Sequence, residues 1–403
     1  MLNFILPRTN IRLYEDKIHT HIDEKIPIIG TRNIYIDNIN EQIKLKADWD
    51  IMNQIYYPYE FIGDVMQTSS HEEHDDNSNH FFSLRYAMHL ELHHFIKHEI
   101  LYTNSETKTL VFYSDDKYKL NCMSYLKNKS NKNICIKYDS TNMKKILSEN
   151  SSSIDHIVIG SHSVDDDDDD YARVSYISVL YALCFQKFNG SSIIKLYDID
   201  TPLSIGILAI LSSMYLEVHL VKPVTSKSDS SEIFVVCKKF LHKNSNLFYK
   251  KFTNIIHNLT KNKVVPDRVA VCTFNNQNYF DLVDAKSSKA KIPELNSGEK
   301  PNFKIDYQYG ILQREAINLQ LMNRINEISI IFYQRRLEYI HTLLNTTHLL
   351  QTYVNENNTK VNATIKNNIH KCLEWTSKYY KPIIFSSEIN ATVLHRLYNR
   401  IDI

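Results

Sequence analysis

The stretch from residue 193 to residue 237 constrains the fold more than any other part of this chain. An apolar run there ends on Lys195, a helix-length apolar segment follows over residues 201–216, and two β-branched runs occupy residues 218–221 and 233–237. Short β-branched runs that alternate with helix-length segments are typical of a doubly wound sheet in which most strands are parallel. This stretch therefore predicts an α/β protein with a Rossmann-like sheet.

The same alternation extends toward the N-terminus. Three short apolar runs predict further strands, at residues 109–113, 134–138 and 157–160. Two segments have helical periodicity, at residues 81–100 and 174–188. The six consecutive aspartates at residues 165–170 repel one another and predict a solvated loop. The predicted sheet thus extends over residues 109–239.

Changes in composition divide the chain into three parts. We predict an N-terminal extension (residues 1–80), an α/β domain (residues 81–260) and a mostly helical C-terminal region (residues 261–403). The extension ends in the polar stretch 71–80, whose three histidines could bind a metal. No helix fixes their spacing, so we predict a solvated loop there and no metal site.

The C-terminal region combines a loop-like segment (residues 281–303) with apolar residues at helical spacing (residues 311–354). The spacing predicts one or two long helices that pack on the sheet or on a partner. Within them, Gln334, Arg335 and Arg336 form a basic group that could contact RNA phosphate or an acidic partner. A solvated helix face is the commoner meaning of such a group.

Composition limits the class of protein. A hydrophobic fraction of 43% is enough for a packed core, and a formal net charge of +1 gives no whole-chain attraction for nucleic acid. The six cysteines include no CxxC pair, which predicts reduced thiols in a cytoplasmic location. The longest uncharged stretch is too short to span a bilayer, so we expect no membrane partner.

Lys195 and Glu232 are candidate functional residues because each stands at the mouth of a predicted strand. A lysine and a glutamate in such a place suit a site that lowers the pKa of a hydroxyl group and binds a charged partner.

The order of these residues resembles the C-terminal half of the FtsJ-like RNA 2′-O-methyltransferases, including the Adrift-type and poxviral cap enzymes. The motifs that carry the resemblance are strand–Lys195, Asp-x-Asp-Thr-Pro, a helix, Val-Lys-Pro and Ser-Glu232 before the last strand. The resemblance implies a Lys–Asp–Lys–Glu tetrad that activates a ribose 2′-hydroxyl for methyl transfer from S-adenosylmethionine (AdoMet). Lys195 and Glu232 then match the second lysine and the glutamate, and Arg85 falls at the position of the first lysine.

Other positions depart from the family pattern. The turn after the strand 109–113 contains Ser114 and Asp115 where the family has a glycine-rich AdoMet loop, and the chain has no glycine between Gly63 and Gly160. Three further candidates follow strands. Asp139 is placed to hold the cofactor ribose, and His162, or Ser161 beside it, replaces the aspartate of the tetrad.

These departures favour a catalytically degenerate protein that keeps the fold as a binding or stimulatory subunit in viral mRNA capping. The poxviral capping-enzyme small subunit is a parallel within the resemblance. Such a protein needs no cofactor and binds capped RNA, another capping or transcription subunit, or both. An active AdoMet-dependent cap 2′-O-methyltransferase with a divergent cofactor loop is the alternative, and a purely structural protein is a third interpretation.

Overall fold

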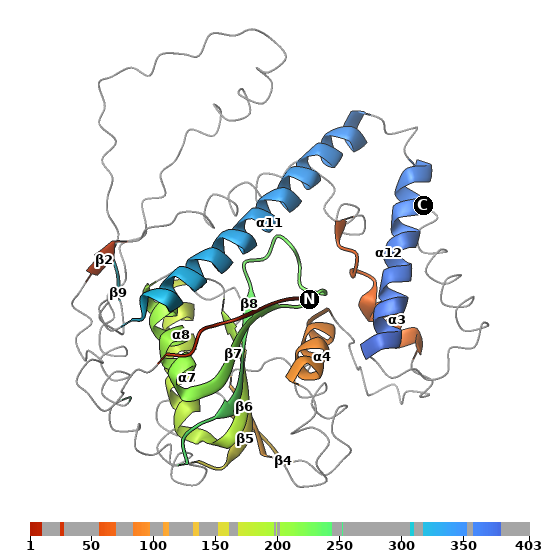
Figure 1. The fold of residues 1–403 in the computed structure, drawn as a ribbon. Coiled ribbons are helices and arrows are strands. Elements are labelled where there is room, and N and C mark those ends of the chain that lie inside the picture. The colour runs from red at the N-terminus through yellow and green to blue at the C-terminus, as the bar shows by residue number, and fades with distance from the viewer. Residues whose placement is uncertain are drawn as a thin grey trace, which may run out of the picture.

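A seven-stranded mixed sheet forms the centre of the protein (Figure 1), with the strand order β1-β7-β8-β6-β5-β3-β4. The computed structural model describes residues 1–9, 25–27, 56–69, 84–96, 108–112, 132–136, 152–160, 168–196, 199, 202–243, 252, 307–309, 317–352 and 358–379. The predicted stretches 71–80 and 281–303 lie outside these residues.

Four adjacent strands are parallel, as predicted: β4 (Lys132–Ile136), β3 (Lys108–Phe112), β5 (Ile154–Ile159) and β6 (Gln186–Leu196). Next to them, β8 (Ile233–Phe240) runs antiparallel between β6 and β7 (Tyr215–Lys222). The chain reverses its strand order between β3 and β5, which is the topological switch point of a doubly wound sheet. The predicted α/β fold with an antiparallel final strand is therefore confirmed.

Helices cover both faces of the sheet (Figure 1). One face packs on α4 (Leu84–Ile96), and the other packs on α7 (Asp168–Phe185), α8 (Pro202–Met214) and the first half of α11 (Leu319–Thr352). Because side chains alternate along a strand, Ile193 contacts the α4 core whereas Ile194 and Leu196 belong to the other core. Lys195 therefore lies on the α4 face of β6.

A second, smaller apolar core joins α4 to α3 (Ile62–Ser69) and α12 (Asn358–Tyr379). Its members include Met66, Leu90 and Trp375, all of them buried. A separate two-stranded sheet pairs β2 (Lys25–Pro27) with β9 (Tyr307–Tyr309). Residues of the predicted N-terminal and C-terminal parts thus pack directly on the α/β domain.

The extension also supplies an edge strand that the sequence analysis did not predict. In this strand, β1 (Leu2–Ile5), Leu2 pairs with Lys222 at the end of β7. Beside this strand, α11 contributes Leu321, Ile325 and Phe332 to the main core, and the Phe332 ring packs edge-on against Phe4 of β1 at a centroid distance of 5.5 Å. The first half of α11 therefore packs on the sheet, which was one of the two alternatives predicted for the C-terminal helices.

Two predicted boundaries were wrong. The aspartate run was expected to be a loop throughout, but α7 begins at Asp168. Acidic residues are in general favoured in the first turn of a helix. The same helix was expected to continue to residue 188, but β6 begins at Gln186. Within this strand Asn189 has a φ of 62°, a left-handed conformation in which asparagine is enriched.

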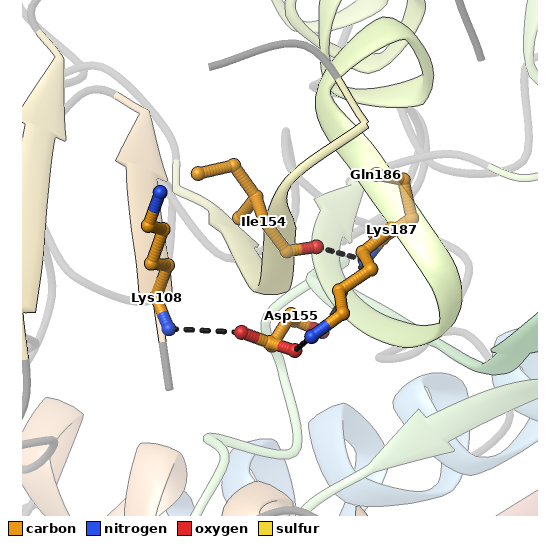
Figure 2. A network of polar contacts seen from close by, with 5 residues as sticks. All are labelled: Lys108, Ile154, Asp155, Gln186 and Lys187. Atoms are coloured by element: carbon orange, nitrogen blue, oxygen red, sulfur yellow. Dashed lines mark hydrogen bonds and ion pairs between the residues drawn. The ribbon is translucent and has the colours of Figure 1, made fainter. Parts of the chain in front are cut away.

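Polar contacts at the amino ends of the parallel strands explain this boundary (Figure 2). The Gln186 side-chain amide donates to the carbonyl of Ile154 at 3.0 Å, and the Lys187 ammonium lies 2.7 Å from the Asp155 carboxylate. Asp155 also accepts a hydrogen bond from the Lys108 amide at 3.0 Å. These bonds join the first residues of β3, β5 and β6, so Gln186 and Lys187 serve the sheet rather than the helix.

Candidate functional site

The two candidate residues Lys195 and Glu232 form an ion pair. Lys195 Nζ lies 2.6 Å from Glu232 Oε2, and the two side chains are 13% and 9% exposed. Lys195 is one residue from the carboxyl end of β6, and Glu232 directly precedes β8. Because β6 and β8 are antiparallel, the end of one and the start of the other meet at the same edge of the sheet. Open α/β sheets bind ligands at the carboxyl ends of their parallel strands, which is this edge.

A serine from the loop between β7 and β8 completes the environment of the glutamate. Ser226 Oγ donates to Glu232 Oε1 at 2.9 Å, and the Glu232 amide donates to Ser230 Oγ at 3.2 Å. Burial raises the pKa of the Glu232 carboxyl, but the charge of Lys195 and the hydrogen bonds from Lys195 and Ser226 outweigh it, so the pKa lies below its ordinary value. Glu232 is therefore ionised near neutral pH and holds Lys195 by charge.

A second lysine, Lys222, belongs to the same site; the sequence analysis included it in the Val-Lys-Pro motif but gave it no role. Its ammonium donates to the backbone carbonyls of Ser230 and, at 3.4 Å, of Glu232. Burial lowers the pKa of Lys222 to about 8, although the charge of Glu232 opposes the shift. The signal was in the sequence, because β7 ends in an apolar run followed by lysine just as β6 does.

The other predicted site residues are not all placed by the structure. Arg85 is exposed in the first turn of α4, the helix that covers the Lys195 face. Ser114, Asp115, Asp139 and His162 lie outside the part of the chain that the structure describes, so their roles stay predictions. β3 ends at Phe112 and β5 at Ile159, and the unplaced candidates Ser114 and His162 come soon after these ends in the sequence.

The basic group predicted on α11 needs a correction. Gln334 and Arg335 are exposed, but Arg336 is only 4% exposed and its Nε donates to the backbone carbonyl of Asp229 at 2.8 Å. Arg336 thus supports the β7–β8 loop from inside the protein. It does not belong to a surface for RNA phosphate or for an acidic partner, because its planar group is used in this internal contact.

The fold and the strand-edge ion pair define a Rossmann-like α/β protein with a lysine–glutamate site at the carboxyl edge of its sheet. No family model matches the chain. Short segments are similar to curated cap-specific mRNA (nucleoside-2′-O-)-methyltransferases. The inactive enzyme 1B of Caenorhabditis briggsae is 38% identical over 66 residues, which are 16% of this chain and 8% of that protein.

Two more of these relatives give the same picture. Enzyme 1 of Caenorhabditis elegans is 32% identical over 89 residues (22% of this chain, 9% of the relative), and enzyme 1 of Homo sapiens is 41% identical over 59 residues (15% and 7%). The similarity thus spans less than a tenth of the length of each of these three relatives. The chain is thus similar to methyltransferases over short segments.

Among solved structures, phosphoethanolamine N-methyltransferase 2 of Haemonchus contortus in complex with S-adenosyl-L-methionine is 12% identical, with a TM-score of 0.25 over 39% of this chain and 38% of that one. A likeness this low carries no conclusion about the present chain. Within the described residues, no helix combines the length and the apolar character needed to cross a membrane.

Proposed function

We propose that this chain is an FtsJ-like RNA 2′-O-methyltransferase-fold protein that binds the capped 5′ end of RNA and does not itself transfer a methyl group. In this proposal it is a binding or stimulatory subunit of an mRNA capping assembly. The observation that carries the proposal is the buried Lys195–Glu232 ion pair at the carboxyl edge of the sheet. The segment similarity to cap-specific mRNA 2′-O-methyltransferases supports the choice of RNA as the ligand.

The charge of the site suits a phosphate-rich ligand. Lys195, Lys222 and Arg336 bring three positive charges to the same strand edge, and Glu232 and Asp229 offset two of them. The excess positive charge is partly buried, so it is less screened by salt than a surface lysine would be. In this proposal a ribose hydroxyl approaches Lys195, whose side chain is 13% exposed and whose ammonium contacts Glu232.

The lack of catalysis is proposed from the residues that would hold the cofactor. AdoMet binding in this kind of fold needs a backbone that approaches the methionine part closely, and glycine permits that approach. The stretch after β3 contains Ser114, Asp115 and Asp116 and no glycine. Two carboxylates close to the methionine carboxylate of AdoMet would repel it. In this proposal the residues after β3 therefore do not fit AdoMet.

Two further replacements point the same way. Arg85 stands where the family resemblance requires a compact ammonium, and a planar guanidinium cannot take the same geometry. His162 or Ser161 stands where the resemblance requires a carboxylate. Without the cofactor loop, the first lysine and the aspartate, the chain keeps only half of the tetrad.

An active cap 2′-O-methyltransferase is the second candidate, and one observation favours it. The Glu232 carboxylate contacts both Lys195 and Ser226, and a carboxylate held in this way can keep a lysine charged and oriented for a hydroxyl oxygen. If AdoMet binds, it supplies the methyl group, and Lys195 orients the lone pair of the 2′-oxygen.

A viral source and a cytoplasmic place of action are further parts of the proposal. Asn, Ile, Lys and Tyr are abundant while glycine occurs only seven times, as an AT-rich genome would produce. The resemblance to the capping proteins of large DNA viruses adds to this. Another capping or transcription subunit is the protein partner that a non-catalytic subunit would require.

Calorimetric titration separates the two candidates. The full chain is titrated with AdoMet and, separately, with a short capped RNA, and methyl transfer to that RNA is measured. We expect RNA binding without AdoMet binding or methyl transfer, and we expect Lys195→Met to weaken RNA binding. Lys187→Met is the matched control, because Lys187 is an exposed lysine at the other end of the same strand.

Each result decides between the candidates. Micromolar AdoMet binding with methyl transfer would replace the proposed function by the active-enzyme candidate. The absence of capped-RNA binding, or an equal loss in Lys195→Met and Lys187→Met, would contradict both.

A further inference from the structure

A fully buried carboxylate on α4 binds the loop that carries the candidate site. Glu91 is 0% exposed. Its Oε2 accepts a hydrogen bond from the Val224 amide at 2.9 Å, and its Oε1 accepts from the Thr225 amide at 3.0 Å and from Thr225 Oγ1 at 2.7 Å. These donors stand at the start of the loop 223–232, directly after β7. A charged group this deeply buried is tolerated when several donors satisfy it, as here.

The C-terminal helix α12 supplies the remaining donor. Trp375 Nε1 donates to the same Oε1 of Glu91 at 2.9 Å, and the Trp375 side chain is 4% exposed. Trp375 also packs in the apolar core that joins α12 to α3 and α4. One carboxylate thus connects α4, α12 and the β7–β8 loop.

The loop leads directly from this carboxylate to the ion pair. Ser226, the neighbour of Thr225, donates to Glu232 Oε1 at 2.9 Å, and its own amide bonds the carbonyl of Pro223 at 3.2 Å to close a turn. Glu232 in turn contacts Lys195 at 2.6 Å. A displacement of Thr225 would therefore move Ser226 and change the contacts of Glu232.

We infer that Glu91 and Trp375 are positioning residues, which hold the β7–β8 loop so that Glu232 stays in contact with Lys195. The C-terminal helix is then a structural part of the candidate site. This inference rests on the proposed function in one respect, which is that the Lys195–Glu232 pair is the functional part of the site. It requires neither AdoMet nor RNA.

The test measures the Glu232 carboxyl by NMR in the full chain. Glutamate is labelled with ¹³C at the side-chain carboxyl, Glu232→Gln assigns the signal, and the pKa is read from a pH titration. The charged groups that face Glu232 are Lys195 and Lys222. Amide hydrogen exchange at Ser226 is the second measurement.

Variants of Thr225 give the sharpest comparison. Thr225→Val keeps the shape of the side chain but removes the hydroxyl donor, so the loop should loosen, the pKa of Glu232 should rise and Ser226 exchange should become about five- to tenfold faster. Thr225→Ser keeps the hydroxyl and should restore both values. Trp375→Phe, which removes only the ring N–H from the network, should shift them in the same direction as Thr225→Val.

Thr376→Val is the matched control. Thr376 is fully buried on the same helix, and its hydroxyl donates to the Cys372 carbonyl at 2.8 Å within α12, away from the loop. Its replacement should destabilise α12 without changing the Glu232 signal.

The inference is wrong if folded Thr225→Val and Trp375→Phe leave the pKa of Glu232 and the exchange at Ser226 unchanged. It is also wrong if Thr376→Val changes them as much. Should Thr225→Val not fold, Trp375→Phe provides the same decision. A wild-type protein that fails to bind capped RNA would contradict the proposed function while these comparisons still decide the inference.

Discussion

Replacement of either member of the Lys195–Glu232 pair should destabilise the protein, and the two replacements should differ. Removing one partner of a buried ion pair typically costs about 3–5 kcal/mol, because the other charge is left without compensation. In Lys195→Met, Glu232 keeps the hydrogen bond from Ser226 and the nearby charge of Lys222. The loss of unfolding free energy should therefore be near the lower end, about 3 kcal/mol.

Glu232→Gln should cost more, about 4–5 kcal/mol, because one carboxylate serves two buried ammonium groups. Lys195 loses its partner at 2.6 Å, and Lys222 loses the charge that opposes the lowering of its pKa by burial. The double replacement Lys195→Met/Glu232→Leu removes both charges and should recover much of the loss, since a buried pair is often no more stabilising than apolar residues of similar volume.

Urea unfolding of the full chain at pH 7, followed by circular dichroism, measures these differences as shifts of the midpoint at constant slope. The exposed pair Lys187–Asp155 is the comparison, because Lys187 is 53% exposed. Lys187→Met should change the unfolding free energy by about 0–1 kcal/mol. The reasoning is refuted if Glu232→Gln is as mild as Lys187→Met, or if the double variant is less stable than both single variants.

Three further predictions concern pH and packing. The pKa of Lys222 is lowered by burial to about 8 from 10.5, so the unfolded state binds more protons between these values. The unfolding free energy of the wild type should then rise with pH over that window, by up to about 3 kcal/mol more than that of Lys222→Met. Urea titrations of both proteins at pH 7.5 and 10 measure this difference. Equal changes with pH in the two proteins would contradict the prediction. Gly190→Ala should cost about 1–3 kcal/mol in thermal unfolding, because a Cβ would meet the Gln186 side-chain amide as well as the carbonyls of Asp155 and Lys187 at 2.8 and 2.9 Å. A neutral effect would show that the first part of β6 can adjust. Arg336→Met should speed amide exchange in the β7–β8 loop about fivefold or more by removing the donor to the Asp229 carbonyl, and unchanged exchange would exclude that support.

The sheet and the ion pair could be predicted because both depend on local patterns. Apolar runs and the segments between them determine which residues form strands. The direction of a strand then determines at which end of the sheet the polar residue at its terminus lies. Lys195 and Glu232 flank strands that pair with each other, with Lys195 opposite Phe234 in the register. Their contact therefore follows from strand direction alone once the two strands are adjacent.

Contacts between distant segments could not be predicted in this way. The pairing of Leu2 with Lys222 places an N-terminal strand at the sheet edge, but its four residues alternate weakly and could pair with any free edge. Arg336 was assigned to a basic surface because its neighbours Gln334 and Arg335 are polar. Only the position of Asp229 shows that its guanidinium points inward.

Glu91 illustrates the physical reason most clearly. The helical periodicity of residues 81–100 puts Leu84, Met88 and Leu92 near one face, which predicts a helix with a single buried side. The structure instead buries Leu90 and Ala87 against α3 and α12, so that α4 has two buried sides. In such a helix the apolar periodicity is weak, and a glutamate within it is taken for a solvent-facing residue.

The burial of Glu91 could be predicted only from the hydrogen-bond donors that surround it, and those donors come from distant parts of the chain. Trp375 lies 284 residues away and Thr225 lies 134 residues away. A carboxyl group is stable at such a buried position only where donors converge on it, because a buried polar group without hydrogen-bond partners costs free energy. The convergence of Trp375 and Thr225 on Glu91 is therefore itself a sign that α12 and the β7–β8 loop have a fixed relation. That fixed relation makes the C-terminal helix relevant to the Lys195–Glu232 site.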